Sequence, residues 1–109
     1  MAEAENIIEI TSKAQFDEAV KSEKLTIVDF WAVWCGPCRV LKPLLHKIAG
    51  EHPEIQLLTV DTEENPDLPA KYEVTNLPTV FFLKNWEIVD SFVGFMPENE
   101  ILEKIEANK

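Results

Sequence analysis

Residues 29–38 read Asp-Phe-Trp-Ala-Val-Trp-Cys-Gly-Pro-Cys, and this stretch decides the fold of the chain. It begins inside an almost continuously apolar run, residues 25–32, which is typical of a central strand buried on both faces. It ends where a helical pattern of apolar residues begins, near Arg39. Cys35 and Cys38 are the only two cysteines among 109 residues. Two thiols at such a strand–helix junction, separated by two residues, indicate dithiol–disulfide chemistry.

Length and composition predict one domain, residues 1–109, with a core of ordinary size. The net charge of −10 argues against a nucleic-acid partner, because phosphate groups attract clustered Lys and Arg. No apolar run approaches the roughly 18 residues of a membrane span, and residues 1–6 are acidic and unlike a secretory signal. We therefore expect a cytoplasmic monomer without a membrane partner, in a compartment where thiols stay reduced unless they do chemistry.

Hydrophobic patterns predict five strands and four helices in the order βαβαβαββα. The expected strands are residues 7–10, 25–31, 55–60, 80–83 and 88–93, and the helices follow residues 12, 35, 65 and 97. Ser12 and Gln15 have the spacing of a capping box, and Asn65 before Pro66 resembles an N-cap followed by a first-turn proline. Pro43 predicts a kink in the second helix. This order indicates an α/β fold with a mixed sheet and helices on both faces.

The positions of the two cysteines predict their roles. Only a thiolate attacks a disulfide, and a free cysteine is only about 3% thiolate at pH 7. Cys35 is expected at a helix N-terminus, where free N–H groups and the helix dipole stabilise an anion, so it is the attacking thiol. Cys38 follows on the same helical face as the resolving thiol. Gly36 lets a partner's backbone approach, Pro37 fits the first turn, and both are candidate substrate-binding residues.

Around these cysteines the chain resembles the thioredoxin family. Residues 29–38 carry that family's Trp-Cys-Gly-Pro-Cys signature, Leu77-Pro78-Thr79 is a second match, and Val93-Gly94 is a third. The resemblance implies a thioredoxin-like fold with about five strands in a mixed sheet and about four flanking helices. It also implies a thiol–disulfide oxidoreductase that reduces protein disulfides with its own redox-active Cys35–Cys38 disulfide and no other cofactor. The implied partners are a thioredoxin reductase and oxidised targets of the ribonucleotide reductase, peroxiredoxin and methionine sulfoxide reductase types.

Asp29 is a second catalytic candidate. A carboxylate between Val28 and Phe30 is costly to ionise, so its pKa should be raised into the range useful for proton exchange. The resemblance implies that Asp29 lies beneath the cysteines and takes the proton of Cys38; the structural alternative is a carboxylate satisfied by backbone donors. Many bacterial members pair this aspartate with a lysine on the next strand. Thr59 matches that position here, so a compensating cation is missing.

The resemblance further implies a peptide-docking surface. The matching proline of the family follows a cis bond and faces the disulfide, so Pro78 is expected to do the same, with the backbone of Leu77 available to a substrate peptide. Trp34 should cover the site, and Gly94 should lie at its edge. Three uncharged segments are expected to converge there as an apolar platform: residues 30–38, 74–83 and 91–97.

Several alternatives stay open at this point. A zinc site needs about four ligands, and since His46 and His52 are the only histidines, we expect no metal. The fold could also serve a disulfide oxidase or isomerase, or a non-catalytic binding subunit. The hairpin turn reads Asn85-Trp86 where the family usually has Asn-Gly, so we expect either another loop type or an exposed Trp86.

Overall fold

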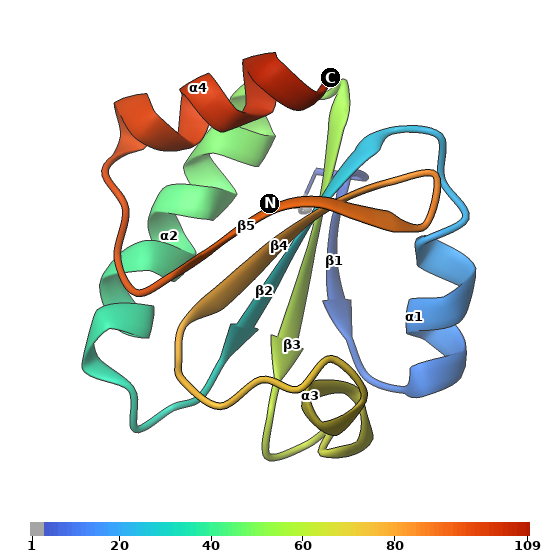
Figure 1. Ribbon diagram of the computed structural model, residues 1–109, viewed down its shortest axis with the longest axis vertical. Coiled ribbons are helices and arrows are strands. Elements are labelled where there is room, and N and C mark those ends of the chain that lie inside the picture. Colours follow the sequence, from blue (N-terminus) through green and yellow to red (C-terminus); the bar gives the residue numbers. More distant parts are fainter. Residues whose placement is uncertain (1–3) are drawn as a thin grey trace.

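The computed structural model describes residues 4–109 as a five-stranded sheet between two layers of helices (Figure 1). The strands are β1 (Ile7–Ile10), β2 (Leu25–Trp31), β3 (Ile55–Asp61), β4 (Thr79–Lys84) and β5 (Glu87–Val93). The helices are α1 (Lys13–Ala19), α2 (Gly36–Glu51), α3 (Asp67–Lys71) and α4 (Glu98–Asn108). Helices α2 and α4 cover one face of the sheet, and α1 and α3 lie on the other side (Figure 1). The predicted element order and fold class are confirmed.

The strand order is β1-β3-β2-β4-β5, which places β2 in the middle of the sheet. Strands β1, β3 and β2 run parallel, whereas β4 runs antiparallel to β2 and β5 antiparallel to β4. Asp29 of β2 is therefore flanked on both sides, by Thr59 of β3 and by Val80 of β4. Because both neighbours are uncharged, the sheet itself offers this carboxylate no ionic partner.

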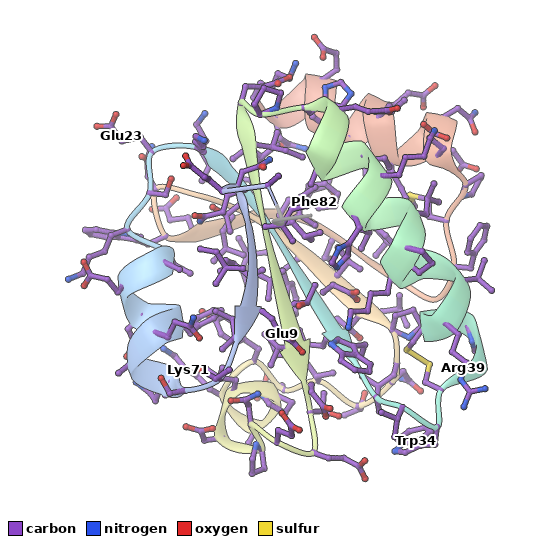
Figure 2. All side chains as sticks on the ribbon, turned by 180° about the vertical axis from the view of Figure 1, so that it is seen from behind. Glu9, Glu23, Trp34, Arg39, Lys71 and Phe82 are labelled. Atoms are coloured by element: carbon purple, nitrogen blue, oxygen red, sulfur yellow. A yellow bond between two sulfur atoms is a disulfide. The ribbon has the colours of Figure 1, made fainter. Side chains whose placement is uncertain are left out.

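Side chains of the central strand alternate between two cores. The core under α2 and α4 consists of Leu25, Ile27, Leu41, Leu45, Ile48, Ala49, Ile55, Leu57, Val80, Phe82, Phe92, Ile101 and Ile105. The core under α1 and α3 consists of Ile10, Phe16, Val28, Phe30, Leu58, Val60, Leu68 and Leu83. Phe82, labelled near the centre of Figure 2, belongs to the first. By the same alternation Asp29 lies on the face of Ile27, so it points toward α2.

Two helix starts differ from their predicted capping. The Ser12 hydroxyl accepts a hydrogen bond from the Gln15 N–H at 3.1 Å, as a capping box requires. The Gln15 side chain, however, accepts from the N–H of Thr11 at 2.6 Å and not from that of Ser12. The box is therefore only half formed, and the second bond instead secures the end of the preceding strand.

Asn65 is not the side-chain cap that we predicted. Helix α3 begins at Asp67, and the residue at its N-cap is Pro66, which has no side-chain hydrogen bond to offer. The buried Asn65 amide donates to the carbonyl of Ile10 at 3.2 Å and to that of Asp61 at 3.2 Å. The Asn65 side chain therefore makes a tertiary contact with β1 and does not cap α3.

Helix α2 carries the redox pair at one end and is capped by a distant side chain at the other. The helix continues through Pro43 to Glu51. At its C-terminal end the buried Asn6 amide donates to the carbonyls of Ala49 at 2.8 Å and Ile55 at 3.0 Å. The Ala49 carbonyl also accepts from the His52 N–H at 3.2 Å, so the amide adds a second bond at the helix end and fixes α2 against the start of β3.

The β4–β5 hairpin closes with a strained tip. Asn85 has φ 51° and Trp86 has φ 69°, so both lie in the left-handed region that the second residue of such a turn usually fills with glycine. The Trp86 side chain is 66% exposed, which confirms one of the two expected outcomes. Among residues 4–109, no helix has the length and apolar character needed to cross a membrane.

Candidate active site

Cys35 and Cys38 form a disulfide at the N-terminal end of α2, with their Cα atoms 5.3 Å apart. Cys35 is the N-cap residue, and its Sγ accepts a hydrogen bond from the Cys38 N–H at 3.3 Å. Both residues are buried, with 4% and 2% of their surface exposed, so exposure hardly distinguishes them. What distinguishes them is the helix: N–H groups of the first turn point at Cys35, where they stabilise a negative charge.

Three segments meet around the disulfide, as the sequence predicted. Leu77 packs against the cluster of Ala32, Cys35 and Cys38, and the bond between Leu77 and Pro78 is cis, which confirms that prediction. The Gly94 N–H donates to the Pro78 carbonyl at 2.8 Å and so joins the third segment to the second. Gly94 has φ 86°, a conformation that glycine adopts without steric penalty.

The rim of this site is apolar. Trp34 is 65% exposed, and Val93 and Phe95, on either side of Gly94, are 62% and 50% exposed. A shallow groove of about 280 Å³ runs beside Trp34 and Leu77. Its other lining residues are Thr62, Pro69, Val74 and Thr75. Figure 2 shows Trp34 at the outer edge of the loop that leads to the disulfide. Such a surface fits an extended peptide with apolar side chains.

Asp29 is 1% exposed, and neither of its carboxylate oxygens has a hydrogen-bond partner among the described residues. The alternative of a carboxylate satisfied by backbone donors is therefore wrong. Burial raises the pKa of Asp29 to about 7, while the positive charge of Lys42 lowers it in part. The predicted direction of the shift is confirmed. At neutral pH this group exchanges a proton with little driving force in either direction.

Comparisons with known proteins agree with this geometry. The thioredoxin family model matches residues 7–107. A thioredoxin of Staphylococcus saprophyticus is 41% identical over 101 residues, which cover 92% of this chain and 95% of that protein. The chain belongs to the thioredoxin family.

Solved thioredoxin structures share the fold. A thioredoxin of Fasciola hepatica superposes with a TM-score of 0.85 at 36% identity, covering 93% of this chain and 98% of the other. A Plasmodium falciparum thioredoxin superposes with a TM-score of 0.84 at 31% identity, with the same coverage of both chains. The thioredoxin-like fold is thus confirmed. So is the activity expected of the family, dithiol–disulfide exchange by a protein-disulfide reductase with the Cys35–Cys38 pair.

Two cations near the pair escaped the sequence analysis. Arg39 lies directly after the second cysteine, and its guanidinium donates twice to the Val33 carbonyl, at 3.3 Å and 3.0 Å. These bonds hold the loop that leads to the disulfide. Figure 2 shows Arg39 beside the disulfide. The sequence feature that could have predicted this contact is the position of Arg39 in the first turn of α2, from which a long side chain reaches back to the preceding loop.

Lys42 is the second cation. Its Nζ lies 3.6 Å from the centre of the Trp31 ring. Trp31 is half-buried and also packs against the cluster of Ala32, Cys35 and Cys38. The signal for Lys42 was its spacing, because residue i+4 after Cys38 lies on the same helical face.

Proposed function

We propose that Cys35 attacks substrate disulfides and that Cys38 resolves the resulting mixed disulfide. The Cys35 thiolate attacks one sulfur of the target, the target S–S bond breaks, and one target thiolate leaves. Cys38 then attacks the Cys35 Sγ, the mixed disulfide breaks, and the second target thiolate leaves. Two electrons have passed to the target and the Cys35–Cys38 disulfide has formed. The supporting observation is the hydrogen bond from the Cys38 N–H to the Cys35 Sγ at the start of α2.

Asp29 takes the proton of the Cys38 thiol during resolution in this proposal. Its side chain faces α2 from the central strand, and its pKa of about 7 leaves roughly half of the molecules ionised at neutral pH. A carboxylate without hydrogen-bond partners among the described residues is also free to accept a proton, directly or through water.

Substrate proteins dock as extended peptides across the apolar rim. Leu77 packs against the cluster that contains the two cysteines, so its backbone is the candidate hydrogen-bonding edge. The proposed contacts are Trp34, Gly36, Pro37, Leu77, Pro78 and Gly94. Gly36 has no atom within 4 Å of where a Cβ would stand, so a partner's backbone has room to approach.

The biological setting follows the family. We place the protein in the cytoplasm as a monomeric single domain, reduced by a thioredoxin reductase and acting on ribonucleotide reductases, peroxiredoxins or methionine sulfoxide reductases. The net charge of −10 supports a protein without nucleic-acid partners. We assign no metal and no cofactor beyond the cysteine pair.

Trapping and labelling test the roles of the two cysteines. Cys38→Ser should accumulate mixed disulfides with target proteins, because attack proceeds and resolution cannot. Cys35→Ser is the matched control and should accumulate far less. In the reduced wild type, limiting iodoacetamide at pH 7 should label Cys35 first. Equal labelling, or equal trapping by both variants, contradicts the assignment.

Turnover separates the reductase from the alternatives. Insulin reduction, with NADPH and a thioredoxin reductase as electron source, should be lost in both single variants. A protein that oxidises reduced substrates faster than it reduces insulin is an oxidase. If a partner complex survives replacement of both cysteines by serine and insulin is never reduced, the chain is a binding subunit.

A further inference from the structure

An ionised Asp29 needs a positive charge nearby, and the sheet does not supply one. Its neighbours in register are Thr59 of β3 and Val80 of β4, and neither side chain ionises. Helix α2 covers that face of the sheet; it carries Cys38, which is disulfide-bonded, Lys42 and, one turn later, His46. Burial and Lys42 are the two influences on the pKa of Asp29. The balancing charge therefore comes from the helix.

Lys42 is held in place by an unusual partner. Lys47, on the same helix, reaches outward to Glu98, with its Nζ 2.9 Å from a carboxylate oxygen. The Nζ of Lys42 instead lies over the ring of Trp31, 3.6 Å from the ring centre. A cation above an aromatic face is attracted by the ring without being neutralised by it. The ring therefore leaves the charge of the ammonium group available to a neighbouring carboxylate.

The location of this charge matches the reaction. Lys42 follows Cys38 by one helical turn on the same face, so it lies beside the thiol that must lose a proton. Trp31 packs against the cluster of Ala32, Cys35 and Cys38, and the Lys42 ammonium group lies over its ring. When the Cys38 proton moves to Asp29, negative charge moves from the carboxylate, whose pKa Lys42 lowers, to the sulfur one helical turn before Lys42.

We propose that Lys42 is a positioning residue that balances the negative charge of ionised Asp29 while the mixed disulfide is resolved, and that the Trp31 ring holds its ammonium group there. The inference rests on the proposed role of Asp29 as proton acceptor. In the balanced step, the proton of Cys38 passes to Asp29, the Cys35–target bond breaks as the Cys35–Cys38 bond forms, and the target sulfur leaves as a thiolate.

Titration of Asp29 tests the electrostatic part directly. In the disulfide form neither cysteine titrates, so the carbon-13 signal of the Asp29 carboxyl reports this group alone. Lys42→Met keeps an apolar stem and removes the charge, so the pKa of Asp29 should rise by at least about half a unit. Lys42→Arg should restore it toward the wild-type value. Lys47→Met removes the same charge from the same helix and should leave it unchanged. No rise in Lys42→Met overturns the proposal.

The rate of resolution then separates this proposal from the role of Asp29. In single-turnover reduction, the pH profile of the Lys42→Met variant should move to higher pH together with the pKa of Asp29. A rise of one unit from about 7 reduces the ionised fraction at pH 7 by about fivefold, and the rate should fall accordingly. A shifted carboxyl titration with an unshifted rate profile supports Lys42 as the balancing charge and removes Asp29 from the mechanism. A shifted rate profile without a shifted titration overturns the Lys42 proposal.

A double-mutant cycle tests the part of Trp31. Trp31→Leu should raise the pKa of Asp29 in the wild-type background, because the ammonium group is no longer held over the ring. In the Lys42→Met background the same substitution should have no further effect, since there is no charge left to hold. Equal rises in both backgrounds would show that Trp31 acts on Asp29 through burial and not through Lys42.

Discussion

Ionisation of Asp29 destabilises the folded protein, because the carboxylate is buried. Its pKa lies at about 7 in the folded protein, against about 3.9 in an unfolded chain, so the folded state binds the proton more tightly. The contribution of Asp29 to folding stability is therefore most favourable below about pH 4, decreases as the pH rises from there through about 7, and is constant above that. The difference between these two pKa values corresponds to about 4 kcal/mol.

Asp29→Asn should remove this pH dependence. At pH 8 the variant should be more stable than the wild type by up to about 4 kcal/mol, and the difference should vanish near pH 4. Urea unfolding at several pH values measures it. The same variant should resolve mixed disulfides more slowly near neutral pH, because the proton acceptor that we propose for Cys38 is gone. A variant that is less stable than the wild type at pH 8 would mean that the carboxylate is satisfied in solution.

Among the elements, the β4–β5 hairpin is the least relaxed. The backbone of Trp86 has φ 69°, a left-handed conformation that costs a residue with a Cβ atom roughly 1–2 kcal/mol. Trp86→Gly should stabilise the protein by about 1 kcal/mol and raise the Tm by about 4 °C. Trp86→Ala is the matched control: it removes the exposed ring and keeps the Cβ, so the strain persists. Equal stabilisation by both variants would assign the effect to the ring and not to the backbone.

Helix α2 depends on Asn6 at the end remote from the cysteines. Asn6→Ala removes the donor for the carbonyls of Ala49 and Ile55 and should destabilise the protein by about 1–3 kcal/mol in urea unfolding. Asn76→Ala is the control, because among residues 4–109 the exposed Asn76 amide bonds only to the neighbouring Thr75 hydroxyl; its effect should stay within about 0.5 kcal/mol. A loss of similar size in both variants would contradict the capping role.

The same elements show why some of them could be predicted from the sequence. Strand β2 was placed at its observed bounds because a strand buried on both faces is a continuous apolar run. The start of α3 was misplaced because Asn65 bonds to Ile10, which is 55 positions away in the chain. Asp29 was found because a lone carboxylate in an apolar strand is conspicuous. Lys42 was missed because a lysine on a helix surface is usually solvated. Its contact with the Trp31 ring depends on tertiary packing that the sequence does not show.

At the scale of the whole molecule, the disulfide and the Leu77-Pro78 segment lie at one end of the sheet. Strand β2 ends beside the start of α2, and β4 begins one residue after Pro78, at the same end. Strand β4 has six residues and therefore spans roughly 20 Å before it reaches the turn at Asn85-Trp86. The hairpin tip thus lies at the other end of the sheet from the disulfide (Figure 1).

The separation of the hairpin tip from the disulfide predicts where the chain tolerates an insertion. A short Gly/Ser segment placed between Asn85 and Trp86 should leave insulin reduction within about twofold of the wild type, since longer loops add little closure entropy. The same segment between Val33 and Trp34 should abolish activity, because it separates Arg39 from the carbonyl that it binds. Circular dichroism confirms that both proteins are folded. A folded but inactive hairpin variant would show that the two ends of the sheet are coupled.

The exposed hairpin tip also makes this protein a candidate carrier. A peptide, dye or surface tether attached at Trp86 would project from the end of the sheet remote from the disulfide. Reductant could then be immobilised on a bead or an electrode with every redox pair directed outward. Replacing the strained tryptophan in the same step would remove an unfavourable backbone conformation, so the attachment point and the stabilising substitution coincide.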